Sequence, residues 1–131
     1  MKRKSGTSAA SILALLSAIH VYWAAGGKRF QAGTIPEVNG KAAFEPGPAM
    51  TLVVAAGLAT AAAAVYRSGT VERRGRPAAA VALIFALRAI GDFRSVGFFK
   101  RKRRSRFAKL DTLVYSPLCV LISALSLGAA R

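Results

Sequence analysis

Charged side chains stand at the ends of two apolar segments in the second half of the chain. Arg88, Asp92 and Arg94 follow one apolar segment, and Asp111 and Tyr115 open the next. Arg88 and Asp92 are four residues apart, and the same spacing separates the two residues of the second group, so a helix places each pair on one face. Carboxylates and cations in this arrangement can bind a ligand, transfer a proton or join two helices.

Two further polar groups, His20 and Trp23, lie near the end of the first apolar segment. Ionisable side chains inside a membrane segment usually point into the helix bundle or a wet cavity, because exposure to lipid is costly. We therefore predict a single polar pocket, open to one side of the membrane and formed by His20, Trp23, Arg88, Asp92, Arg94, Asp111 and Tyr115.

Each of these residues also has a purely structural interpretation. Arg88 and Asp92 can form an internal salt bridge, and His20 can be a hydrogen-bonded packing residue. Asp111 can cap the N-terminus of the last helix. Trp23 fits the aromatic belt at a membrane surface. The sequence alone leaves these alternatives open.

Motifs for metal or covalent chemistry are lacking. His20, Asp92 and Asp111 can meet in space, but the chain contains no H-x-x-H or C-x-x-C spacing. It contains no phosphate-binding glycine loop and no G-x-S-x-G nucleophile motif. Its single cysteine, Cys119, excludes an intramolecular disulfide. We expect no metal and no cofactor.

Composition places the chain in a membrane. Of its 131 residues 53% are hydrophobic, yet its formal net charge is +15. The apolar residues form long blocks with the basic residues between them, which is typical of an integral membrane protein. Membrane lipids are therefore the expected partners, and nucleic-acid binding is not expected. Frequent alanine and arginine indicate a bacterium with GC-rich DNA, and hence a bacterial cytoplasmic membrane.

Four spanning helices are predicted, over residues 8–25, 48–66, 77–99 and 110–130, in one all-α four-helix bundle that covers the whole chain. A cleaved signal peptide is the alternative for the first apolar run, which is longer than such peptides usually have. The third helix ends near Gly91 or near Phe99, and the longer version is preferred because 15 residues are short for a span. The fourth is expected to kink at Pro117, with Ser116 as a partner for the freed carbonyl.

Four alternating spans bring the end of the first helix, the end of the third and the start of the fourth to one face of the membrane. A long, irregular loop over residues 26–47, rich in glycine and proline, lies at the same face. The basic run that starts at Lys100 is interpreted as a lipid-facing loop of little functional information.

Three motifs together resemble a bacterial family of small membrane proteins, the domain of unknown function 3995. They are H-x-x-W-A-x-G-G, R-A-I-G-D-F-R-x-V-G-F-F-K and F-A-K-L-D-T-x-x-Y-S-P-L-C, and with Pro36 they cover most of the chain. The resemblance implies a four-helix membrane protein and no known activity. The positions that it marks are His20, Trp23, Gly26, Gly27, Pro36, Arg88, Gly91, Asp92, Arg94, Gly97, Asp111, Tyr115, Ser116, Pro117 and Cys119.

Three functional hypotheses follow. The first is a multi-pass membrane protein whose one-sided pocket binds a small molecule, a lipid head group or a proton. The second is a small membrane enzyme that uses Asp92 or Asp111 with His20 as acid and base. The third is a structural subunit without a ligand, in which the polar residues only fix the helix packing.

Overall fold

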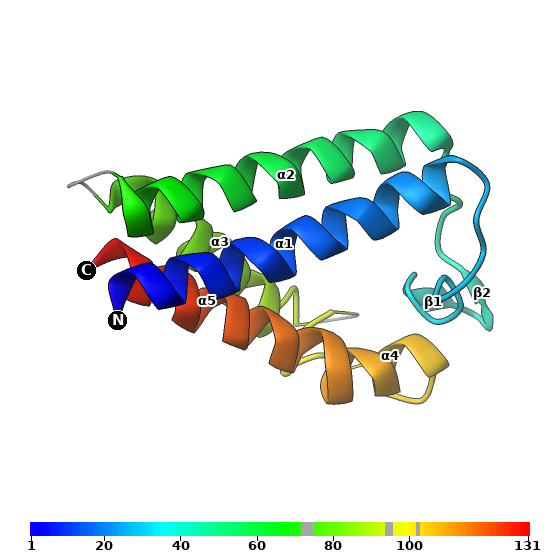
Figure 1. The fold of residues 1–131 in the computed structure, drawn as a ribbon. Helices are drawn as coiled ribbons and strands as arrows, with labels where there is room; N and C mark the ends of the chain where they lie inside the picture. Colours follow the sequence, from blue (N-terminus) through cyan, green and yellow to red (C-terminus); the bar gives the residue numbers. More distant parts are fainter. Residues whose placement is uncertain (72–74, 94–95, 102) are drawn as a thin grey trace.

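The computed structural model spans residues 1–131 and describes all of them except 72–74, 94–95 and 102. The fold is all-α, as predicted. Its helices are α1 (Lys2–Ala24), α2 (Pro48–Thr70), α3 (Arg76–Ile90), the short α4 (Arg106–Leu110), the π-helical segment η1 (Asp111–Tyr115) and α5 (Ser116–Ala130). Both termini lie at one end of the molecule, and the long first loop with α4 lies at the other (Figure 1).

The helices pack as two pairs, α1 with α2 and α3 with α5, and α1 also lies along α5 (Figure 1). Glycines bring the first pair close together, because an added Cβ at Gly6 would lie 3.0 Å from Gly69 Cα. The buried core is built mainly from small and medium residues, among them Ala9, Leu13 and Ile122. Many large apolar side chains point outward instead, which is expected of helices that face lipid.

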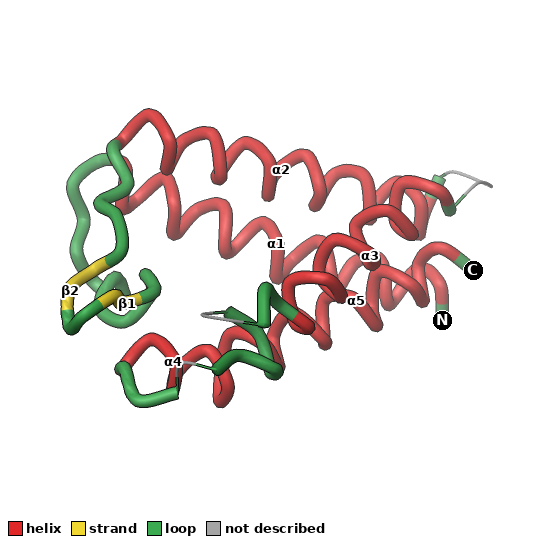
Figure 2. The backbone as a smooth tube through the Cα atoms, turned by 180° about the vertical axis from the view of Figure 1, so that it is seen from behind, coloured by secondary structure: helices red, strands yellow, loops and turns green. Residues whose placement is uncertain are grey.

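Three helical stretches are long and apolar enough to cross a membrane: Lys2–Ala24, Pro48–Thr70 and Arg106–Ala130. The third of them joins α4, η1 and α5 into one continuous run (Figure 2). Proline begins α2 at its first position, where its missing N–H has no helical partner.

The predicted third span over residues 77–99 is wrong in its second part, because α3 ends at Ile90. Gly91 has a φ of 84°, a left-handed conformation that stops the helix. The chain then folds back, and Phe98 N–H donates a hydrogen bond to the Ala89 carbonyl at 2.8 Å. With 15 residues, α3 is only about 22 Å long.

The last helical run begins at Arg106, four residues before the predicted start. The Ser105 hydroxyl caps this run, because it accepts a hydrogen bond from Ala108 N–H at 3.0 Å. The turn before Pro117 widens into η1, in which Ser116 N–H donates to the Asp111 carbonyl. The proline is thus accommodated by a π-turn. The prediction that the Ser116 hydroxyl bonds to the carbonyl freed by Pro117 is wrong, because this hydroxyl donates to the Asp111 carboxylate.

The first loop contains a hairpin that the sequence analysis did not predict. β1 (Glu37–Val38) pairs antiparallel with β2 (Lys41–Ala42). Asn39 and Gly40 form its two-residue turn, both with positive φ, which is the typical geometry of an Asn-Gly hairpin. The hairpin lies near α4 in both views (Figures 1 and 2).

Candidate functional site

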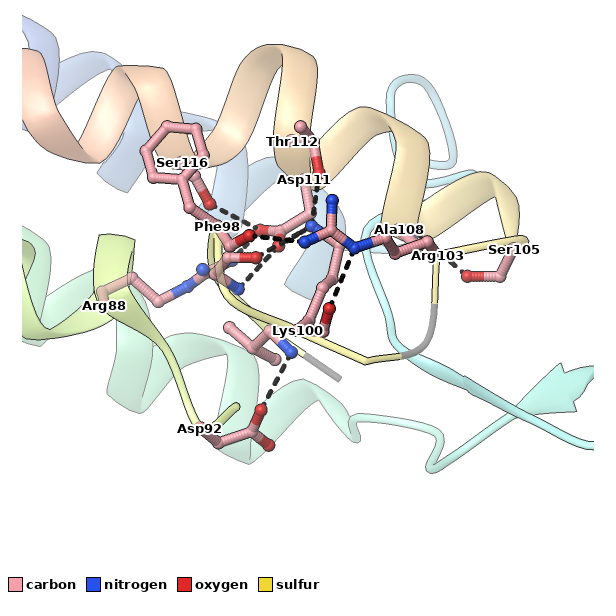
Figure 3. A network of polar contacts seen from close by, with 12 residues as sticks. Arg88, Asp92, Phe98, Lys100, Arg103, Ser105, Ala108, Asp111, Thr112 and Ser116 are labelled. Atoms are coloured by element: carbon pink, nitrogen blue, oxygen red, sulfur yellow. Dashed lines mark hydrogen bonds and ion pairs between the residues drawn. The ribbon is translucent and has the colours of Figure 1, made fainter. Parts of the chain in front are cut away.

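The carboxylate of Asp111 lies at the centre of a buried polar network (Figure 3). Its side chain is 0% exposed, and it accepts hydrogen bonds from four donors. Arg88 Nη2 lies 2.8 Å and Ser116 Oγ 3.3 Å from Oδ1. Gly97 N–H lies 2.7 Å and Lys100 Nζ 3.1 Å from Oδ2. We call this group, together with Thr112, the Asp111 cluster.

Lys100 is the residue of this cluster that the sequence analysis missed. It is only 2% exposed, and its ammonium group donates to the Gly97 carbonyl at 2.8 Å, to Asp111 and to the Thr112 hydroxyl. All three ammonium donors are therefore used. The interpretation of the basic run as a lipid-facing loop is wrong for this first residue. Its position at the end of the second family motif was the available signal.

The backbone at two glycines between α3 and Lys100 helps to position this lysine. Gly91 and Gly97 both have positive φ, and a Cβ on either would collide with backbone of the segment that faces it. Asp92 accepts a hydrogen bond from Val96 N–H at 3.0 Å on Oδ1, which holds the turn. Arg103 donates to the Lys100 carbonyl at 3.1 Å from Nε and to the Phe98 carbonyl at 3.3 Å from Nη2. Side chains thus provide hydrogen-bond partners for part of this irregular backbone.

Two sequence predictions about this region are corrected. Arg88 and Asp92 do not share a helical face, because the helix ends between them, and Arg88 pairs with Asp111 instead. Asp111 is not the N-cap of the last helix, since Ser105 fills that role. Arg94, also predicted to belong to the pocket, lies outside the described residues.

His20, Trp23 and Tyr115 come together elsewhere, around a cavity of about 440 Å³. We call it the loop cavity, because the first loop covers it between α1 and the last helical run. It is lined by Leu16, Ile19, His20, Trp23, Phe30, Ala32, Thr34, Arg106, Leu110, Val114, Tyr115 and Leu118. His20, Trp23 and Thr34 also line a neighbouring cavity of about 250 Å³ that extends to Met50 and Val54 on α2.

Local contacts orient the polar groups of the loop cavity. His20 Nδ1 lies 2.7 Å from the Leu16 carbonyl, which can only accept, so a proton is assigned to Nδ1. The His20 and Trp23 rings meet edge to face with centroids 4.9 Å apart. Trp23 Nε1 donates to the Arg29 carbonyl at 2.7 Å. Aromatic faces, an imidazole, a phenol and a guanidinium therefore border a mainly apolar space.

The predicted pocket thus separates into two regions. Arg88 and Asp111 belong to the Asp111 cluster, whereas His20, Trp23 and Tyr115 line the loop cavity. Within the part of the chain that the structure describes, no group of three or more His, Cys, Asp or Glu residues is placed to hold a metal ion. Asp111 does not line the loop cavity, and all its hydrogen bonds are internal.

Taken together, these features define a small all-α protein with three helices of membrane-spanning length and a cavity beneath its first loop. The chain belongs to the family of proteins of unknown function DUF3995, whose model matches residues 13–126. This confirms the resemblance noted in its three motifs. Comparisons with curated proteins and with solved structures gave no match.

Proposed function

We propose that this chain is a multi-pass protein of the bacterial cytoplasmic membrane that binds a membrane amphiphile in the loop cavity. The observation that carries the proposal is the combination of volume and lining. About 440 Å³ lies within the range of small-molecule sites, and a mainly apolar wall with a few polar groups is typical of such sites. An apolar tail fits against Leu16, Ile19 and Leu118, while Arg106 and Tyr115 supply polar contacts.

The Asp111 cluster supports the membrane part of the proposal. At about 22 Å, α3 is shorter than the hydrocarbon core of a bilayer. Of the residues that follow α3, Val96 and Gly97 donate backbone hydrogen bonds to the carboxylates of Asp92 and Asp111, and the Phe98 carbonyl accepts one from Arg103. A short helix, followed by backbone groups that side chains satisfy, can thus serve as a further span beside the three long apolar helices.

An acid–base role for Asp111 has little support from the geometry. Its two oxygens are engaged by two cations, a backbone N–H and a hydroxyl, and its side chain is 0% exposed. A substrate would have to displace these donors. The cluster is better suited to the structural role considered for it, while binding falls to the loop cavity.

Native mass spectrometry of the protein released from nanodiscs of one defined phospholipid tests the binding proposal. We expect one retained lipid per chain. Leu110→Trp places a larger side chain in the loop cavity and should abolish retention. Leu113→Trp is the matched control, because Leu113 is 74% exposed and does not line the cavity. Equal retention by both variants, or none by the unmodified chain, would contradict the proposal.

A further inference from the structure

A third cavity, of about 490 Å³, lies between the β1–β2 hairpin and the basic segment before α4. We call it the basic cavity. It is lined by Glu37, Gly40, Arg101, Arg103, Arg104 and Ser105. Three guanidinium groups and one carboxylate thus border one open space, on the same end of the molecule as the loop cavity.

The three arginines are not equivalent. Arg103 is committed to the protein through its bonds to the Lys100 and Phe98 carbonyls. Arg101 and Arg104 are exposed and have no hydrogen bond or ion pair with any residue that the structure describes. Glu37 likewise has no ion pair within the described chain, although it borders the same space as these cations. The cavity therefore presents two available guanidinium groups and one available carboxylate.

The chemistry of these groups specifies a ligand with both signs of charge. A guanidinium presents its donors in a fork that matches phosphate oxygens. A carboxylate beside it disfavours a purely anionic ligand but accepts hydrogen bonds from a primary ammonium. We propose that the basic cavity holds a phosphate-bearing head group that also carries an ammonium, with phosphate on Arg101 and Arg104 and ammonium on Glu37.

The closeness of the loop cavity points to a lipid as the source of this head group. Ser105 lines the basic cavity, and the next residue, Arg106, lines the loop cavity. The first loop contributes to both, through Glu37 and Gly40 on one side and Phe30 and Thr34 on the other. One amphiphile can therefore place its tail in the loop cavity and its head in the basic cavity. This inference rests on the function proposed above.

Ordinary attraction of a basic loop to a membrane surface makes the opposite prediction. It depends on net charge alone and favours an anionic lipid over a zwitterionic one. Recognition by Glu37 together with the arginines favours phosphatidylethanolamine over phosphatidylglycerol. Phosphatidylcholine should bind least, because its quaternary ammonium has no N–H to donate to Glu37.

Trp23 supplies the measurement, because it is the only tryptophan of the chain and lines the loop cavity. Phospholipids with brominated acyl chains quench tryptophan fluorescence on contact. The fraction of brominated lipid with each head group is raised in nanodiscs of unbrominated phosphatidylcholine. We expect half-maximal quenching at a several-fold lower fraction of brominated phosphatidylethanolamine than of brominated phosphatidylglycerol. Added soluble phosphoethanolamine should not reduce this quenching. A reduction would show that the basic cavity binds the free phosphate ester, and would overturn the assignment to a lipid.

Three variants separate the contributions. Glu37→Gln should reverse the order of the two lipids, and Arg104→Gln should weaken both. Lys109→Gln removes one exposed cation of the neighbouring α4 that does not line the basic cavity, and should change neither. A preference of the unmodified chain for phosphatidylglycerol, or equal quenching by all head groups, would overturn the head-group inference and leave the proposed function standing. Quenching that does not saturate and is unchanged by Leu110→Phe would overturn the proposed function itself.

Discussion

The Asp111 cluster and the loop cavity both contain polar side chains that the sequence assigned to one pocket, yet they differ in what these polar groups bind. In the cluster, the carboxylate accepts four hydrogen bonds and the Lys100 ammonium donates three. One donor, Arg88 Nη1, is buried without a partner among the described residues. In the loop cavity, one ring nitrogen of His20 and the ring nitrogen of Trp23 bond to backbone carbonyls, while both rings line the cavity.

The difference shows that charge inside an apolar segment does not by itself mark a ligand site. A buried ion pair stabilises little relative to an apolar replacement, but losing one partner is costly because the other charge is left buried. A binding group, in contrast, needs unused hydrogen-bonding capacity and access. Changes in the cluster should therefore act on stability, and changes in the cavity on binding.

The largest effect is expected for Asp111→Ala. It leaves the Arg88 and Lys100 charges without their carboxylate, so the free energy of unfolding should fall by about 3–5 kcal/mol. Unfolding in detergent, followed by the loss of helical circular dichroism, measures the change. Glu45→Ala is the control, because Glu45 is exposed and makes no hydrogen bond or ion pair with the described residues. A loss no greater than in this control would remove the basis for a structural cluster.

Gly91→Ala should come next. Its φ of 84° disfavours a side chain, and the added Cβ collides with the Val96 carbonyl. A loss of about 3 kcal/mol is expected, at the upper end of the cost of such a backbone position. Gly57→Ala is a matched control, because its Cβ meets nothing within 4 Å and alanine suits a helix. The same detergent assay should show no loss there, and equal behaviour of the two variants would show that the fold-back is unimportant.

Lys100→Gln tests the residue that sequence analysis missed. It removes a charge-assisted bond to Asp111, and a loss of about 2 kcal/mol is expected. Lys109→Gln should change stability by less than about 0.5 kcal/mol, because Lys109 is exposed. Combining each change with Asp111→Ala distinguishes the two residues further: only Lys100 should show coupling to the carboxylate.

The smallest effect on stability is expected for Tyr115→Phe, which should act on binding instead. The ring remains against Phe107, at a centroid distance of 6.0 Å, while the hydroxyl at the loop cavity is lost. Unfolding should be unchanged within about 0.5 kcal/mol. Lipid retention in native mass spectrometry should fall, because a hydrogen bond to the ligand contributes about 1 kcal/mol. A loss of stability with unchanged retention would place Tyr115 with the cluster instead.

Hydropathy was sufficient to predict the all-α fold and three of the four main helices. A long apolar run in lipid must satisfy its own backbone hydrogen bonds, and a helix does so. The end of α3 was misplaced because it depends on how Gly91 and Gly97 pack against facing backbone, which is a tertiary contact. Helical spacing then paired Arg88 with the wrong carboxylate, since that argument holds only within one continuous helix.

The candidate site was only partly predictable for a related reason. His20, Trp23 and Tyr115 were correctly placed at the same end because helix order fixes the ends that meet. Lys100 was missed because it lies in a loop, where no period relates sequence position to burial. The π-turn before Pro117 was also missed, as the proline indicates a disturbed helix but not which kind.

The Asp111 cluster also has a consequence for how the chain enters a membrane. Arg88 and Lys100 are synthesised before Asp111, so until the carboxylate arrives their charges lack the acid that later accepts from both. If α3 is the further span proposed above, its entry into lipid is therefore unfavourable on its own, and α3 and the last helical run should leave the translocon together as one hairpin. A nascent chain that stops before Asp111 should fail to integrate α3, which a glycosylation-mapping assay can detect.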